Sequence, residues 1–130
     1  MTATPRSVTI ELKGSVGTWG TNPNRYRGVR AKIRSFRAAS EKAIVAIIKS
    51  DWDGNALGSV YFDIIEFYCG KSTDPDNLIA GMKPVIDAFT HKGVILDDKA
   101  KYVKGYGTTY VQVPHRNQRK VVIQCQEVIS

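Results

Sequence analysis

Apolar and polar residues alternate over residues 7–13, which predicts a first strand with one buried face. Apolar residues then recur at a spacing of three to four, and Ser35 is a suitable N-cap, so the pattern predicts a helix over residues 35–50. Residues 59–69 form the strongest strand signal in the chain. They are apolar on both alternating faces, which predicts a central strand covered on both sides.

A second helical pattern follows over residues 76–91, with Gly93 suited to the C-terminal cap. Pro84 lies inside this pattern and removes one helical hydrogen bond, so we expect a kink there. Residues 108–113 and 120–128 have strand character and are separated by a short basic turn, which predicts a hairpin.

The chain has 130 residues, which suits one domain spanning residues 1–130. The order strand, helix, strand, helix, strands predicts an α/β fold of the α+β kind. We expect one mixed β-sheet of about four to five strands, with two main helices packed on it. Asp63 and Glu66 interrupt the central strand, one on each face, and are expected near its ends or edges, although a catalytic role stays open.

The charge of the chain is strongly positive, with a formal net charge of +7 and a pI near 9.5. This favours an anionic partner, nucleic acid first, over an unspecialised basic protein. No acidic residue occurs between residues 12 and 40, where arginines alternate with aromatic residues in a pattern suited to phosphate contact and base stacking. The candidate DNA contacts are Arg25, Arg27, Arg30, Lys32, Arg34, Arg37, Lys71, Arg116 and Arg119.

Cys69 and Cys125 match no zinc or redox spacing, and each falls in a strand-like run. We therefore expect buried free thiols, which suit a reducing compartment. No apolar stretch is long enough to span a membrane, and the first residues lack the apolar core of a signal peptide. These features predict a cytoplasmic protein without a membrane partner or a small-molecule cofactor.

Two carboxylates two residues apart, Asp74 and Asp76, precede the second helix. Pro75 holds Asp74 in extended backbone, and Asp76 falls where an N-cap is expected, so both side chains can converge on one point. An oxygen-only site of this kind favours Mg²⁺, or Mn²⁺, over Zn²⁺. A third ligand would come from Asp97 or Asp98. The alternative is that the first pair is a helix-capping turn and the second an acidic turn.

Lys83 follows Asp76 by seven residues and would lie on nearly the same face of a continuous helix. It could there neutralise a phosphate in the transition state. The alternative is an ion pair with Asp87, four residues later.

Three runs in the middle of the chain, read together, resemble the RusA family of Holliday junction resolvases. They are Asp74-Pro75-Asp76-Asn77-Leu78, Lys83-Pro84-Val85-Ile86-Asp87-Ala88-Phe89 and Gly93-Val94-Ile95-Leu96-Asp97-Asp98. The resemblance is strong over residues 72–103 and extends weakly to residues 22–26.

The resemblance implies a RusA-like fold in which Asp74, Asp76 and Asp98 bind the catalytic Mg²⁺, with Asp97 a weaker candidate. The family lysine corresponds to Ala80, and Lys83 follows three residues later, like an insertion of about one helical turn. The resemblance also implies a homodimer that resolves four-way DNA junctions by paired symmetric nicks, in DNA recombination and repair.

Two functions from different classes therefore stand side by side. One is a Mg²⁺-dependent, structure-selective endodeoxyribonuclease that hydrolyses phosphodiesters. The other is a non-catalytic, basic nucleic-acid-binding protein whose acids only cap turns. A nucleotide phosphotransferase is disfavoured because the chain has no glycine-rich phosphate loop with its lysine.

Overall fold

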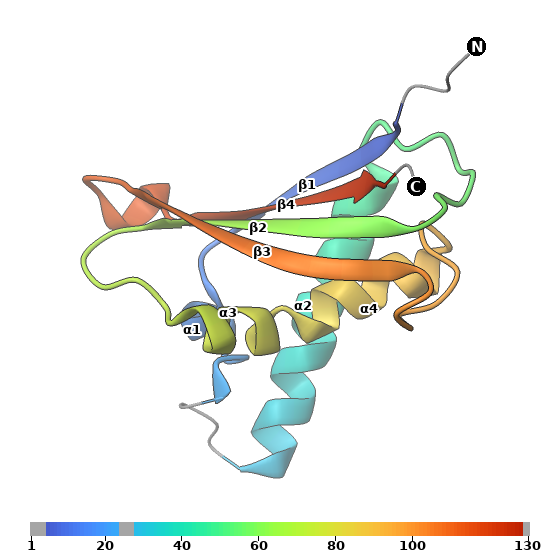
Figure 1. Ribbon diagram of the computed structural model, residues 1–130. Helices are drawn as coiled ribbons and strands as arrows, with labels where there is room; N and C mark the ends of the chain where they lie inside the picture. Colours follow the sequence, from blue (N-terminus) through green and yellow to red (C-terminus); the bar gives the residue numbers. More distant parts are fainter. Residues whose placement is uncertain (1–4, 24–27, 129–130) are drawn as a thin grey trace.

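The computed structural model describes residues 5–23 and 28–128. In Figure 1 the sheet crosses the upper part of the molecule, short helices lie below it, and the long helix α2 (Val29–Ile48) runs from the bottom of the view up behind the sheet. In chain order the elements are β1 (Ser7–Lys13), α1 (Val16–Trp19), α2 (Val29–Ile48), β2 (Val60–Tyr68), α3 (Pro75–Gly81), α4 (Lys83–Lys92), β3 (Val103–Gln112), the 3-10 helix η2 (Arg116–Gln118) and β4 (Lys120–Glu127).

The four strands form one mixed sheet in the order β1-β4-β2-β3. β4 pairs antiparallel with both β1 and β2, whereas β2 and β3 are parallel and are joined by the crossover through α3 and α4. The predicted single-domain α+β fold with a mixed sheet is thus confirmed.

The predicted hairpin of the last two strands is wrong, because β2 lies between β3 and β4 in the sheet. The short turn around η2 carries the chain past one strand instead of reversing it into a neighbouring position. Alternating apolar residues determine which face of a strand is buried but not which strand lies beside it. The pattern therefore could not predict that β2 lies between β3 and β4.

β2 is central, but only one of its faces is fully buried. Val60, Phe62, Ile64 and Glu66 are buried, and the residues between them are partly exposed. Figure 1 shows why: the helices all cover the same face of the sheet. The expectation of a strand covered on both sides is therefore wrong. Glu66 lies near the end of β2, as expected, but on its buried face.

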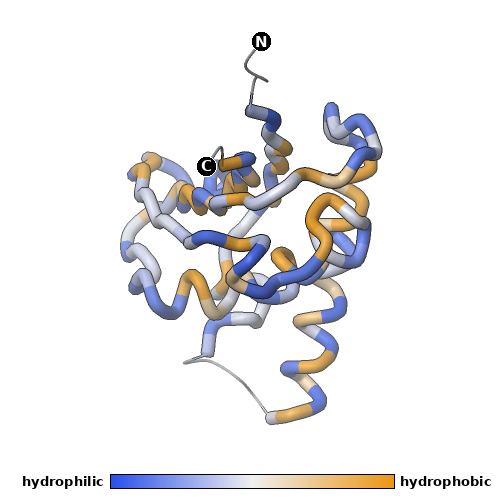
Figure 2. Tube along the Cα trace, turned by 45° about the vertical axis from the view of Figure 1, so that its right-hand side comes forward, coloured by the Kyte–Doolittle hydropathy of each residue, from blue (hydrophilic) through white to orange (hydrophobic). Residues whose placement is uncertain are grey.

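α2 begins at Val29, six residues before the predicted cap at Ser35. The only buried residues of this helix are Ala39, Ala43 and Ile47, all in its second half. Its first half extends away from the sheet, and hydrophobic and hydrophilic residues alternate along it (Figures 1 and 2). Because this part has no buried stripe, the search for apolar periodicity did not detect it.

The predicted kink in the second helix is a complete break at Met82, between α3 and α4. Pro84 lies in the first turn of α4, where its missing N–H would have no helical partner in any case. Gly93 ends α4 with φ of 84°, as predicted. Lys83 therefore begins a new helix and does not share one continuous helical face with Asp76.

β3 begins at Val103, earlier than the predicted residue 108. The extra part contains Gly105 and Gly107, which weaken a strand signal. Both glycines accommodate Tyr61 of β2, because a Cβ at residue 107 would lie only 2.6 Å from the Tyr61 hydroxyl. The glycines are thus explained by a close side-chain approach from the neighbouring strand.

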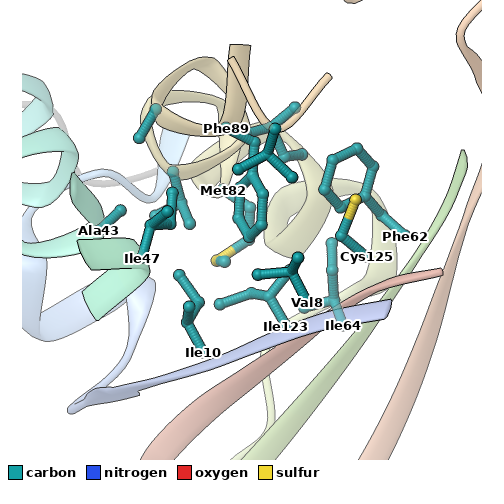
Figure 3. Close-up of a cluster of buried hydrophobic side chains, with 14 of the residues drawn as sticks. Val8, Ile10, Ala43, Ile47, Phe62, Ile64, Met82, Phe89, Ile123 and Cys125 are labelled. Carbon is teal, nitrogen blue, oxygen red and sulfur yellow. The ribbon is translucent and has the colours of Figure 1, made fainter. Parts of the chain in front are cut away.

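One hydrophobic core joins the sheet to α2 and α4 (Figure 3). Phe62 is fully buried at its centre. Its ring meets Phe89 edge-on at a centroid distance of 5.3 Å and stacks on Tyr106 at 5.8 Å. No helix in the described ranges is both long and apolar enough to cross a membrane.

Both cysteines are free, but only one is buried as predicted. Cys125 lies in the core, and burial raises the pKa of its thiol to about 12. Cys69 follows the end of β2 and is partly exposed, so for this residue the expectation of a buried thiol is wrong.

Gly81→Ala is expected to lower the free energy of unfolding by about 1–3 kcal/mol. A Cβ at this buried position would lie 2.7 Å from Cγ1 of Val16, a buried β-branched residue with little freedom to move. Chemical denaturation would measure the loss. The matched control is Gly17→Ala, where the nearest atom is 3.5 Å away and the change should be neutral or slightly stabilising. Equal stabilities of the two variants would contradict this packing.

Candidate functional site

Asp74 and Asp76 lie at the start of α3, and both are exposed. Asp74 is the N-cap residue, with the extended backbone that Pro75 predicts (φ −59°, ψ 143°). Asp76 is in the first turn of the helix, so its predicted place at the N-cap is wrong by two residues. The reason is that Pro75 itself occupies the first helical position, which it prefers.

Tyr110 on β3 lies near enough to the start of α3 for three acidic groups to influence the pKa of its hydroxyl. Burial raises the pKa of Tyr110 on β3, and the negative charges of Glu66, Asp74 and Asp76 raise it further. The Thr108 hydroxyl acts in the opposite direction. Three carboxylates, from β2 and from the start of α3, thus act on one point near the end of β3.

Glu66 is the site residue that the sequence interpretation missed. It is only 2% exposed and pairs in register with Tyr110 on the neighbouring strand. Its Oε1 accepts a hydrogen bond of 2.9 Å from the backbone N–H of Thr73. Its Oε2 and the Tyr110 hydroxyl are buried without a hydrogen-bond partner among the described residues. The available signal was the even-numbered position of Glu66, in step with Phe62 and Ile64 of the buried face.

A polar groove of about 580 Å³ runs beside Asp74. Lys71 and Arg119 are the cations in its wall, and Asn22 and Asn77 add amide groups. Two of the predicted DNA contacts, from separate parts of the chain, therefore lie next to the acidic pair. The groove combines cations and amides suited to a phosphate backbone with a carboxylate suited to a metal.

The other predicted DNA contacts are distributed differently. Those on the protruding half of α2 are all exposed, and Arg116 is exposed on η2. Arg25 and Arg27 lie outside the described residues. The α2 group consists of Arg30, Lys32, Arg34 and Arg37.

Asp98 lies in a second cluster, beyond α3. It lines a depression of about 200 Å³ with Lys83, Asp87 and Tyr106. The pKa of Tyr106 is raised mainly by burial and then by the charge of Asp98. Tyr106 and Tyr110 are four residues apart on β3, which is about 13 Å along the strand. Within residues 5–23 and 28–128, no three His, Cys, Asp or Glu side chains are grouped closely enough to hold one ion.

Asp97 is engaged within its own turn. Its Oδ1 accepts a hydrogen bond of 2.7 Å from the backbone N–H of Asp98, and its Oδ2 lies 3.8 Å from the ammonium of Lys99. A hydrogen bond with the Asp98 side chain is the main reason that the pKa of Asp97 is lowered. Asp98 also lines the depression that it shares with Lys83, Asp87 and Tyr106.

Lys83 forms an ion pair with Asp87, which was the alternative to a role beside Asp74 and Asp76. Its Nζ lies 3.5 Å from Oδ1 of Asp87, four residues later, and both side chains are at least half exposed. The break at Met82 places Lys83 in the cluster of Asp98 and Asp87.

The groups around Asp74 fit a hard divalent cation. Neither Asp74 nor Asp76 forms an ion pair with another described residue. Oε2 of Glu66 has no hydrogen-bond partner among the described residues, and the carboxylates of this region offer only oxygen atoms as ligands. Mg²⁺ and Mn²⁺ prefer such oxygen ligands and are often held by only one or two carboxylates.

No protein-family model and no curated protein matched this chain. The likeness to the RusA family accordingly rests on the three sequence runs alone.

Proposed function

We propose that the protein is a Mg²⁺-dependent endodeoxyribonuclease that cuts branched DNA, with four-way junctions as its substrate. One observation carries the proposal: the exposed carboxylate of Asp74 lines a groove whose cations are Lys71 and Arg119, and the exposed Asp76 follows two residues later in the first turn of α3. An acidic pair inside a chain with a net charge of +7 is suited to a cation shared between protein and phosphate.

In this proposal Asp74 and Asp76 hold the cation, with Mn²⁺ able to replace Mg²⁺. When bound, the cation supplies Lewis acidity toward the scissile phosphate. Lys71 and Arg119 bind the phosphates on either side of the cut, and Arg119 is held for this by a hydrogen bond of 3.1 Å from its Nε to the Arg116 carbonyl. Asn77 lines the same groove and orients the strand.

The basic half of α2 supports the choice of a large DNA substrate. It extends away from the sheet and presents Arg30, Arg34 and Arg37 to solvent. Such a projection can contact a second duplex arm at a distance from the groove. A homodimer with two-fold symmetry would present two equivalent sites to the two strands of a junction that must be cut.

The test compares cleavage of a synthetic four-way junction with that of a linear duplex of the same sequence. We expect paired nicks in the junction with Mg²⁺ or Mn²⁺, and none with EDTA. The products should carry 5′-phosphate and 3′-hydroxyl ends that a ligase can seal. Equal cutting of both substrates would contradict junction selectivity, and no cutting of either would contradict the nuclease.

The second candidate is a basic DNA-binding protein without catalysis. The observation that favours it is that Asp98 lines a depression with Lys83 and Asp87, whereas Asp74 lines the groove of Lys71 and Arg119. Such a protein would bind junctions equally well in EDTA and in Mg²⁺ and would never nick them. Salt dependence does not separate the two candidates, because phosphate neutralisation dominates binding in both.

Arg119→Ala is expected to weaken junction binding and to reduce the slope of log K against log salt by about one. The reason is the loss of one cation from the groove beside Asp74. Binding assays in EDTA at several salt concentrations would measure both quantities without cleavage. Lys42→Ala is the control: it removes an exposed cation of α2 that does not line this groove, and it should change binding less. Identical slopes for Arg119→Ala and the parent protein would exclude a phosphate contact by Arg119.

A further inference from the structure

Glu66 is a carboxylate in a position where an apolar residue would stabilise the core. It follows Val60, Phe62 and Ile64 on the buried face of β2, and it is 2% exposed. A buried carboxylate is costly unless both oxygens are satisfied. Oε1 has a partner in the Thr73 N–H, but Oε2 has none among the described residues. The described part of the chain thus contains a buried carboxylate oxygen without a hydrogen-bond partner.

A purely structural role accounts for only half of this arrangement. Holding Thr73, and with it Asp74, needs a single acceptor, which the amide oxygen of a glutamine would also provide. The negative charge and the second oxygen would then serve no purpose. Tyr110, opposite Glu66 in the sheet, does not form a hydrogen bond with Oε2 of Glu66.

We propose that Glu66 is a positioning residue for the cation of the acidic pair. Its Oε1 fixes Thr73 and so the direction of Asp74. Its negative charge, closed off from solvent at Oε2, attracts the hydrated cation through space. This inference rests on the proposed function.

An indirect effect of Glu66 fits the structure better than a third direct ligand. The described side chains include no group of three that could coordinate one ion. Mg²⁺ gives up its waters reluctantly and usually keeps several when it binds to carboxylates. Carboxylates that bind such outer groups orient a metal site and tune its affinity. Glu66 is joined to the start of α3 by its hydrogen bond to Thr73, the residue before Asp74, and the charges of all three acids raise the pKa of Tyr110.

The test is Mn²⁺ binding to Glu66→Gln, measured by calorimetric titration of the full chain, together with thermal unfolding in EDTA. Glutamine keeps an oxygen for the Thr73 N–H and removes only the charge. We expect the Kd for Mn²⁺ to rise about 10- to 100-fold, the range found when such outer partners of a metal site are changed. In EDTA the midpoint of unfolding should be unchanged or higher, because an unpartnered buried charge has been removed.

Asp63→Asn is the matched control, since Asp63 lies on the same strand but on its opposite, partly exposed face. It should bind Mn²⁺ like the parent protein. If Glu66→Gln also binds like the parent, or fails to fold in EDTA, the inference about Glu66 is overturned, and the nuclease stands as long as the parent cuts junctions. If the parent itself neither binds Mn²⁺ nor cuts, the inference and the proposed function both fail.

Discussion

Asp76→Asn is expected to reduce Mg²⁺-dependent cleavage of a four-way junction about a thousandfold. A catalytic cation contributes several kcal/mol of charge stabilisation to the transition state, and each 1.4 kcal/mol is tenfold in rate. Because Asp76 is exposed and makes no ion pair among the described residues, its loss should leave the fold intact. Single-turnover cleavage of a labelled junction would measure the rate.

Two controls show whether the loss of cleavage is specific to Asp76: junction binding in EDTA, and substitution of another exposed aspartate. Junction affinity in EDTA should be unchanged or higher for Asp76→Asn, because a negative charge near the DNA has been removed. Asp51→Asn alters another exposed aspartate, in the loop after α2, and should cut at the parent rate. If Asp76→Asn cuts as well as the parent, the assigned site is wrong.

Phe62→Ala is expected to lower the free energy of unfolding by about 3–5 kcal/mol. The ring is fully buried at the centre of the sheet, between Phe89 and Tyr106, so truncation leaves a cavity that these rings cannot fill. Denaturant unfolding, followed by tryptophan fluorescence, would give the difference.

The control is Phe67→Ala on the same strand. Phe67 belongs to the face without helices, is partly exposed and has the ammonium of Lys120 4.7 Å from its ring centroid. Its truncation should cost clearly less than that of Phe62. Equal losses at the two positions would contradict a core on only one face of the sheet.

Local sequence patterns predicted the elements that carry a buried stripe. The strand over residues 7–13 was predicted with its bounds, because its alternation matches one covered face. The first half of α2 was missed, since it packs against nothing that would impose a period on it. The order of the strands in the sheet could not be predicted from local patterns either. The position of β2 between β3 and β4 depends on the crossover and not on the residues of the last two strands.

The candidate site was predicted in the same uneven way. Asp74 and Asp76 are adjacent in sequence, so their proximity needed no knowledge of the fold. The convergence of Asp98 with them requires a tertiary contact, which local patterns do not provide, and Asp98 lines a depression together with Lys83 and Asp87. Glu66 was read as a polar interruption of an apolar run, whereas its position on the buried face made it the residue to question.

The most direct test of the central claim is the anomalous scattering of Mn²⁺ in crystals grown from, or soaked in, MnCl₂. The account predicts a peak between the carboxylates of Asp74 and Asp76, on the side facing Lys71 and Arg119. A peak only at the cluster of Asp98, Asp87 and Lys83, or no peak at either cluster at a concentration that supports cleavage, would contradict it.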